Sequence, residues 1–265
     1  MPAILSAHHV SKTYDTGQHG GTVAIRDLSM DVEEGEFVCL LGASGCGKST
    51  MLSLFAGFLQ PSTGQVMLRG VPITGIEPRC GVVFQSYALF PWKTVRGNVE
   101  FGLKMQGKPA AQRRIRAQYF IDLVKLTGFE DRYPTELSGG MQQRVTLARI
   151  LAADPEVLLM DEPFAALDAM TRQIMQAELL RIHAGSGKTT VFITHSIDEA
   201  LILSDRIVVM SARPGRIKAT VLNPLPRPRH VEMQLTPEYI ALKTAVWKLV
   251  ESELQAQDET APRQP

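Results

Sequence analysis

Residues 37–50 read Phe-Val-Cys-Leu-Leu-Gly-Ala-Ser-Gly-Cys-Gly-Lys-Ser-Thr, an apolar run followed directly by a glycine-rich loop. The apolar run is typical of a strand covered on both faces, and residues 48–58 predict a helix. The loop between them matches the pattern G-x-x-x-x-G-K-[ST], which a chain of this composition would contain by chance only about 0.01 times. We therefore expect a phosphate-binding loop formed by Gly42, Ala43, Ser44, Gly45, Cys46, Gly47, Lys48, Ser49 and Thr50.

Each part of this loop suits a nucleotide phosphate. Glycines let successive backbone N–H groups point into one anion-binding concavity, and the following helix directs the positive end of its dipole to the same place. Lys48 is expected to reach the β- and γ-phosphates, and the Ser49 hydroxyl to bind Mg²⁺. The alternative is a glycine-rich turn that holds no ligand.

Two other stretches resemble reactive loops without completing the pattern. Residues 185–189, Gly-Ser-Gly-Lys-Thr, lack the required first glycine because position 182 is Ile182, so we predict a loop between a helix and a strand there. Residues 42–46 resemble the nucleophile elbow G-x-S-x-G, but Cys46 stands where its final glycine is required.

Elements of two kinds alternate through the rest of the chain. Short apolar runs at 157–160, 191–194 and 207–210 predict buried strands, and residues 170–184 and 197–203 predict the helices between them. This alternation indicates an α/β fold with a parallel sheet. From about 91 to 153 the pattern is mostly helical, which predicts an insertion; a last helix is expected at about 237–255.

Charged groups follow two of these predicted strands. Asp161 and Glu162 end one buried strand and His195 ends the next, and ligands in open α/β sheets bind beyond the carboxyl ends of the strands. Asp161 is expected to face a metal ion and Glu162 to activate a water molecule. A solvated acidic turn and a structural histidine are the alternatives.

Composition narrows the class of protein. The 265 residues are 45% hydrophobic and 21% charged, which permits a folded core. With 28 Lys and Arg against 27 Asp and Glu, the net charge of +1 argues against a nucleic-acid partner. No apolar run reaches the 18 residues that a membrane span needs. The three cysteines match neither a disulfide framework nor a zinc site, and we expect reduced thiols in a cytosolic compartment.

A further motif makes the pattern specific. Residues 137–144 read Leu-Ser-Gly-Gly-Met-Gln-Gln-Arg, and Leu167-Asp168 follows the acidic pair. With the phosphate loop, Asp161-Glu162 and His195 in this order, the chain resembles the ATP-binding subunit of an ABC transporter over residues 4–235. Met141, where many relatives have glutamine, and Ala165 and Ala166, where serine or glycine is frequent, depart from that pattern without being expected to abolish activity.

The resemblance implies a fold and a domain plan. The fold class is α/β: a P-loop NTPase core with a mostly parallel sheet, an N-terminal antiparallel β part and an inserted helical subdomain. The implied ATP-binding domain spans 4–235, with the α/β core at 4–90 and 156–222 and the helical subdomain at about 91–155. A C-terminal helix at 236–256 and a disordered tail at 257–265 complete the plan.

The resemblance also implies site roles. Tyr14 is placed like the aromatic residue that stacks on adenine, Gln85 like the glutamine that contacts Mg²⁺ and the attacking water, Glu162 like the catalytic base and His195 like the switch histidine. Lys48 completes the catalytic set. Ser138, Gly139 and Gly140 resemble the motif that binds the γ-phosphate of the nucleotide held by the other subunit. Asp168 resembles the aspartate of the loop that crosses the dimer interface.

Partners and solute follow from the same resemblance. It implies ATP and Mg²⁺ as ligands, a homodimer, membrane permease subunits at the cytoplasmic face of the membrane and, indirectly, a solute-binding protein. Residues 84–92, including Trp92, and residues 54–59 and 211–216 are similar to the nitrate, sulfonate and taurine importer group, with the loop 42–46 favouring taurine. A nitrate or other small-solute importer, a non-transport ABC ATPase and a phosphotransferase are the alternatives. Trp92 could lie near the permease or be a partly buried residue at a helix start.

Overall fold

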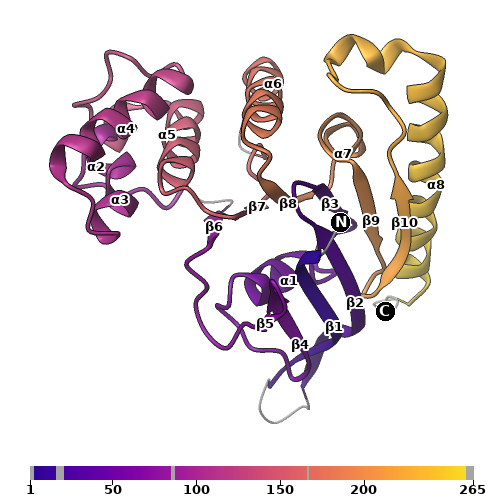
Figure 1. Ribbon diagram of the computed structural model, residues 1–265. Helices are drawn as coiled ribbons and strands as arrows, with labels where there is room; N and C mark the ends of the chain where they lie inside the picture. The colour runs from indigo at the N-terminus through magenta and orange to yellow at the C-terminus, as the bar shows by residue number, and fades with distance from the viewer. Residues whose placement is uncertain (1–2, 16–20, 85–86, 166, 261–265) are drawn as a thin grey trace, which may run out of the picture.

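The computed structural model describes residues 3–15, 21–84, 87–165 and 167–260. Its central sheet contains six strands: β3 (Phe37–Leu41), β6 (Cys80–Val83), β7 (Val157–Asp161), β8 (Thr189–Thr194), β9 (Arg206–Met210) and β10 (Ile217–Leu222). They lie in the order β10-β9-β3-β8-β7-β6 (Figure 1). Strands β9, β3, β8, β7 and β6 are parallel and β10 is antiparallel to β9, so the prediction of a mostly parallel sheet is confirmed.

Both faces of this sheet are buried, as the apolar run in β3 predicted. Val38 and Leu40 face one apolar cluster, and Phe37, Cys39 and Leu41 face another. The first cluster includes helix α1 (Lys48–Phe55), and the second includes helices α6 (Ala169–Ser186) and α7 (Ile197–Leu203). This two-sided cover holds the strands in place and leaves their ends free to carry the site loops.

The ends of two helices differ in how well they were predicted. Helix α1 was expected to reach Phe58 but ends at Phe55, because Gly57 adopts the left-handed conformation (φ 72°) that closes helices. Helix α6 ends at Ser186 with Gly187 in the same conformation, and β8 begins at Thr189. Helix α6 therefore runs two residues beyond the predicted end at 184, and the loop predicted at 185–189 is reduced to residues 187–188.

An antiparallel sheet packs against the first apolar cluster. Its strands are β1 (Ala3–Tyr14), β2 (Thr22–Glu33), β4 (Thr63–Leu68) and β5 (Val71–Pro72), in the order β2-β1-β4-β5. This is the N-terminal antiparallel part that the fold class required. Strand β1 contacts both β2 and β4, and its last residue is Tyr14.

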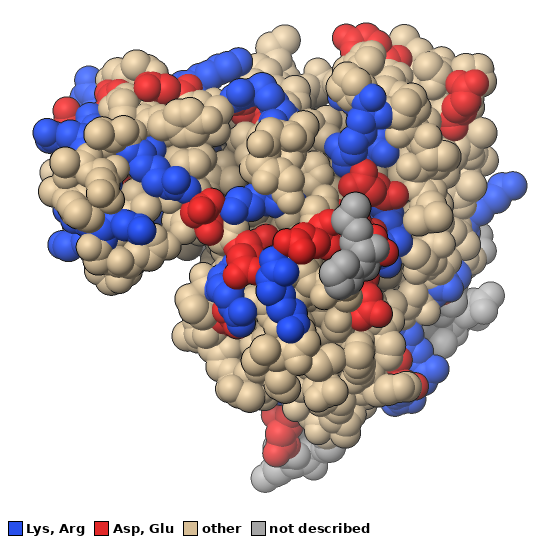
Figure 2. Space-filling view, viewed as in Figure 1, with Lys and Arg blue, Asp and Glu red and all other residues tan. Residues whose placement is uncertain are grey.

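A group of helices forms what we call the helical lobe (Figure 1). Its members are α2 (Val95–Val99), α3 (Phe101–Met105), α4 (Ala110–Leu123), the 3-10 helix η1 (Pro134–Glu136) and α5 (Gly139–Ala152). It has an apolar core of its own, which includes Leu103, Ile121 and Val145. Lys and Arg side chains are prominent on the face of this lobe shown in Figure 2. The lobe falls within the range 91–155 in which helices were expected.

The C-terminal helix lies against α7. After the 3-10 helix η2 (Val231–Leu235), helix α8 runs over Pro237–Thr260, four residues beyond the 256 at which the sequence interpretation ended it. The predicted tail at 257–265 is therefore helical to 260, and residues 261–265 lie outside the described residues. The Tyr239 hydroxyl donates to Asp198 at 2.8 Å and Lys243 donates to the same carboxylate, which fixes α8 beside α7. Within the described ranges, no helix combines the length and apolarity that crossing a bilayer requires.

Asn98 connects the start of the helical lobe to the loop that precedes it by hydrogen bonds, and its replacement tests this role. Its buried amide accepts from the Phe90 N–H and donates to the carbonyl oxygens of Phe90, Lys93 and Thr94. Asn98→Ala should lower the free energy of unfolding by about 1–3 kcal/mol, because buried backbone groups lose their partners. Urea unfolding followed by circular dichroism measures this. Ile115→Ala, on the exposed face of α4, is the control with little expected change; equal midpoints would contradict the assignment.

Candidate active site

The phosphate loop joins the end of β3 to the start of α1. Gly47 precedes α1 with φ 94°, and a Cβ there would lie 2.9 Å from the carbonyl oxygen of Ala24, so glycine is required on two grounds. Ser44 and Ser49 are exposed while Cys46 is buried. The loop thus folds over its own cysteine and presents hydroxyl groups outward at the N-terminus of α1, where an anion is favoured.

Lys48 is held inside this loop. Its side chain is 5% exposed, and Nζ donates to the carbonyl oxygens of Gly42 at 2.8 Å and Ala43 at 2.9 Å. The ammonium group therefore lies where a bound phosphate would meet it. These bonds are the charge-assisted kind that a phosphate oxygen can take over.

Ser49 and Asp161 come together from two elements. Ser49, at the start of α1, lies near enough to Asp161, at the end of β7, to lower the pKa of its carboxyl. Burial raises the pKa of Asp161, the negative charge of Glu162 adds to that rise, and Ser49 and the charge of Lys48 oppose it. A hydroxyl and a carboxylate oxygen are a suitable pair of protein ligands for Mg²⁺, which fills its other positions with waters and phosphate oxygens. The donor set therefore fits the expected ion.

Glu162 and His195 face one another across neighbouring strand ends. Their carboxylate Oε2 and ring Nδ1 atoms are 3.3 Å apart. Glu162 has φ 44°, a left-handed conformation that is uncommon outside glycine, and its N–H donates to the Ile193 carbonyl at 3.0 Å. The backbone turns sharply here and directs the acidic side chain toward His195 rather than along the sheet.

Tyr14 brings the antiparallel sheet to the same loop. Its hydroxyl lies 3.3 Å from Oγ1 of Thr50, in the first turn of α1, and its ring is 38% exposed. Lys12 lies over the ring, with Nζ 5.6 Å from its centroid. An exposed aromatic face beside the phosphate loop is a surface on which a nucleobase can stack.

Two helix N-termini form a second group of predicted residues. Ser138 caps α5 and accepts from the Met141 N–H, and Asp168 caps α6 and accepts from the N–H and hydroxyl of Thr171. Bonds from Thr171 lower the pKa of Asp168. A Cβ on Gly140 would lie 3.0 Å from Cγ2 of Thr171, so the two N-termini touch. Gly139 and Gly140 sit in the first turn of α5.

The predicted residues thus fall into two groups. The structure brings Tyr14, residues 42–50, Asp161, Glu162 and His195 to one sheet edge, and it brings residues 138–140 and Asp168 together at the starts of α5 and α6. Gln85 lies outside the described residues, and so does Ala166.

Glu199 is a buried carboxylate behind His195 that the sequence interpretation missed. It is 6% exposed, the Thr194 hydroxyl donates to it, and Arg172 lies 3.8 Å away. Burial raises the pKa of Glu199. Its own N–H donates to Ser196 and the Ser196 N–H donates to Thr194, so both neighbours of His195 are tied to it. The spacing Ser-x-x-Glu at this helix start was the available signal.

Arg213 was also missed as a neighbour of the loop. Its Nε donates to the carbonyl oxygen of Gly45 at 3.3 Å. Gly215 exchanges backbone hydrogen bonds with strand β2 through Ala24 and Arg26. The sequence 211–216 was noted only for its likeness to relatives, and the structure gives it a contact with the phosphate loop.

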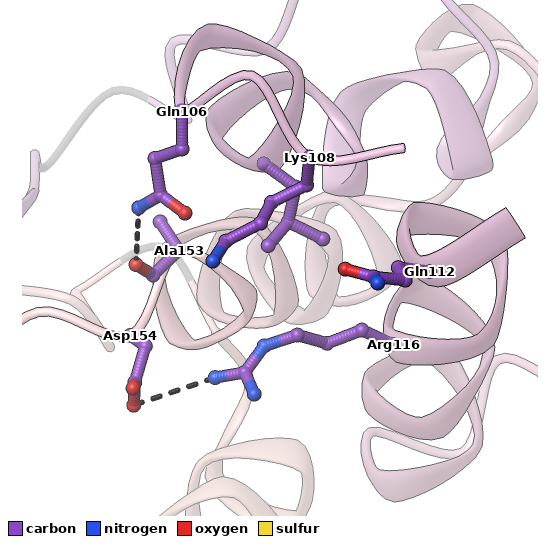
Figure 3. Close-up of a pocket in the computed structure, with 7 residues that line it drawn as sticks. Gln106, Lys108, Gln112, Arg116, Ala153 and Asp154 are labelled. Atoms are coloured by element: carbon purple, nitrogen blue, oxygen red, sulfur yellow. Dashed lines mark hydrogen bonds and ion pairs between the residues drawn. The ribbon is translucent and has the colours of Figure 1, made fainter. Parts of the chain in front are cut away.

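An apolar groove separates the helical lobe from the sheet. Phe58 stacks on Phe84 and Phe90 packs on Phe101, with centroids 5.8 and 4.5 Å apart, around a cavity of about 390 Å³. A polar cavity of about 310 Å³ shares Ala153 with it (Figure 3). Trp92 is 71% exposed, so the alternative of a partly buried residue is wrong.

Comparison with known proteins gives a consistent picture. Residues 25–165 match the protein family described as ABC transporter. An ATP-binding protein of Brucella abortus biovar 1 is 50% identical over 88% of this chain and 90% of its own length. The taurine import ATP-binding protein TauB of Jannaschia sp. is 47% identical over 80% of each chain. The nitrate import ATP-binding protein NrtC of Synechococcus elongatus is 43% identical over 97% of this chain and 40% of its own.

Solved structures agree. The ATP-binding cassette MJ0796, in a dimeric post-hydrolysis state bound to ADP and Pi, matches with a TM-score of 0.75 and 31% identity over 84% of this chain and all of that chain. CbiO1 of Clostridium perfringens, described as part of the ABC transporter complex cbiONQ, matches with a TM-score of 0.76 and 27% identity over 93% and 96%.

The cysteines provide a test of the packing around the loop. Burial raises the pKa of the thiols of Cys39 and Cys46, and that of Cys80 to about 12. Because the thiolate is the reactive form, iodoacetamide at pH 8 should modify the native chain about tenfold more slowly, or slower still, than the urea-unfolded chain. Intact-mass spectrometry over time measures the difference. Equal rates would show that the loop around Cys46 is open.

Proposed function

Because this chain belongs to the ABC transporter family, as an ATP-binding subunit of the nitrate, sulfonate and taurine import group, we propose that its hydrolysis of ATP powers the import of a sulfonate such as taurine. The proposal rests above all on one feature: the phosphate loop, the Ser49–Asp161 pair and the Glu162–His195 pair meet at a single sheet edge. We propose 4–235 as the ATP-binding domain, with α8 as an addition to it.

Nucleotide binding follows from the loop geometry. The adenine ring would stack on Tyr14, and the phosphates would lie along the N–H groups of the loop at the start of α1. Lys48 would exchange its carbonyl partners for β- and γ-phosphate oxygens. Ser49 and Asp161, with Gln85, would hold Mg²⁺, which neutralises phosphate charge when bound.

Hydrolysis requires a proton acceptor next to the γ-phosphate. Glu162 would accept a proton from the attacking water as the new P–O bond forms and the bond to the β-phosphate oxygen breaks, leaving ADP and phosphate. His195, 3.3 Å from the carboxylate, would orient Glu162 and contact the γ-phosphate. Glu199 would act through His195, because its carboxylate accepts from the Thr194 hydroxyl and its N–H donates to the Ser196 hydroxyl, on either side of that residue.

A complete site requires a second copy. Ser138, Gly139 and Gly140 belong to a helix N-terminus suited to anions, yet they form a group separate from the phosphate loop. In a head-to-tail homodimer they would bind the γ-phosphate held by the partner, with Asp168 at the interface. The dimeric state described for the cassette MJ0796 supports this arrangement.

The groove between the sheet and the helical lobe suits a permease segment. Its aromatic walls would take an apolar helix from the membrane partner, and exposed Trp92 lies beside Phe90. Lys108 and Arg116 point into the adjoining polar cavity, with Asp154 paired to Arg116 (Figure 3). This would set the protein at the cytoplasmic face of the membrane, and the permease would connect it to a solute-binding protein.

Glu162→Gln separates binding from hydrolysis. Loss of the proton acceptor should lower the ATPase rate by about 10²- to 10⁴-fold while ATP and Mg²⁺ still drive dimer formation. Gel filtration with ATP and Mg²⁺ should then give a dimer peak. Lys48→Ala in the same background is the matched control and should remain monomeric, because the phosphate charge is uncompensated. A monomer for Glu162→Gln would contradict the dimeric site.

The solute is tested in the whole transporter. The chain, its permease and its binding protein are reconstituted in liposomes, and ATPase activity is measured with taurine, other sulfonates and nitrate. Sulfonates should stimulate hydrolysis, since the loop 42–46 favours the taurine branch of the importer group. Stimulation by nitrate alone would contradict the proposed solute and favour the likeness to NrtC.

A further inference from the structure

A cavity of about 650 Å³ opens between the phosphate loop and helix α8. Its walls include Ser44 from the loop, His195 just after β8, Ile197 at the start of α7, and Lys243, Trp247 and Val250 from α8. Positions 243, 247 and 250 are spaced by four and three residues, so they form one face of the helix. The cavity therefore borders the two loops at which nucleotide hydrolysis is proposed.

The α8 side of this cavity is apolar in effect. Lys243 is already paired with Asp198 at 2.8 Å, which also accepts the Tyr239 hydroxyl. The rest of this side consists of the Trp247 ring, which is 50% exposed, and the partly buried Val250. Covering this apolar surface would be energetically favourable. An occupant should be apolar and able to reach the loop.

The chain carries such a group at the start of α6. Met170 is 74% exposed and Ile174 is 49% exposed, and their spacing of four residues puts them on one face. They lie two and six residues after Asp168, and Gly140 touches Thr171 in the same turn. The exposed apolar pair and the residues proposed to bind the partner's γ-phosphate are thus parts of one continuous surface.

We propose that, when ATP closes the dimer, Met170 and Ile174 of each copy enter the cavity between α8 and the phosphate loop of the other. This rests on the proposed head-to-tail dimer: if Ser138 faces the partner's phosphate loop, the neighbouring start of α6 faces the flank of that loop. Methionine adapts to irregular cavities and contacts aromatic rings favourably. Helix α8 then completes the dimer interface, and each cavity is closed by the partner copy.

The proposal can be tested by cross-linking between copies. All three native cysteines are buried, so introduced exposed thiols react selectively. In the Glu162→Gln background, chains with Met170→Cys are mixed with chains carrying Trp247→Cys and treated with a short bismaleimide. Cross-linked dimer should form with ATP and Mg²⁺ and fall several-fold with ADP. Replacing Trp247→Cys by Ile115→Cys, on the exposed face of α4, should give no such product.

A second measurement covers the case in which Trp247→Cys folds poorly. The chain has two tryptophans, so Trp92→Phe in the Glu162→Gln background leaves Trp247 as the only indole. Its emission should shift to shorter wavelength with ATP and Mg²⁺, because the ring becomes covered. Met170→Lys should abolish this shift and raise the dimer dissociation constant about tenfold or more, as for loss of an apolar anchor.

The outcomes separate the two proposals. A dimer by gel filtration that gives neither the cross-link nor the emission shift would overturn the α8 contact and leave the proposed function standing. An emission shift that persists in Met170→Lys would mean that another group fills the cavity, and would also overturn it. Absence of any ATP-dependent dimer would instead overturn the proposed dimeric site itself.

Discussion

The parallel pairing of β7, β8 and β3 is the constraint on which the site depends. Leu41 is paired with Thr194, and Asp161 is paired with Ile193. The phosphate loop therefore starts just after one paired residue, and His195 and Glu162 each directly follow another. A slip of one residue in either pairing would turn these side chains to the other face of the sheet. Each residue of β3 packs into one of the two apolar clusters, so such a slip would also disrupt the close packing of both.

This edge of the sheet holds a partly buried acid and an uncommon backbone conformation, both of which are unfavourable on their own. Asp161 is a partly buried acid next to a second acid, and burial raises its pKa, but Ser49 and Lys48 oppose the rise. Glu162 keeps an uncommon backbone conformation because its N–H is bonded to Ile193. Behind them, Glu199 anchors both neighbours of His195. These groups are therefore positioned by the sheet and by a buried carboxylate.

Features formed by residues adjacent in the chain could be predicted from the sequence, whereas contacts between distant residues could not. The phosphate loop and Asp161-Glu162 were accessible because a buried strand and the loop after it are adjacent in the chain. Strand β1 was less visible, because its burial follows pairing with both β2 and β4 and does not alternate simply. The contact of Arg213 with Gly45 joins residues 168 positions apart, and no local pattern encodes it. Glu199 did leave a local signal, the capping spacing with Ser196, which the sequence interpretation did not use.

The division of the predicted residues into two groups has a consequence for coupling. The first group, at the sheet edge, can hold a nucleotide within one chain, whereas the second, at the starts of α5 and α6, has its polar side chains bonded within its own helices. Ser138 and Asp168 thus fix the helix ends and leave the first turns available to a partner. Helix α5 contributes Arg149 and Ile150 to the wall of the aromatic groove near its C-terminus, and residues 138–140 lie at its N-terminus. The residues proposed to face a partner copy and the groove proposed for a permease segment are therefore joined by one helix, α5.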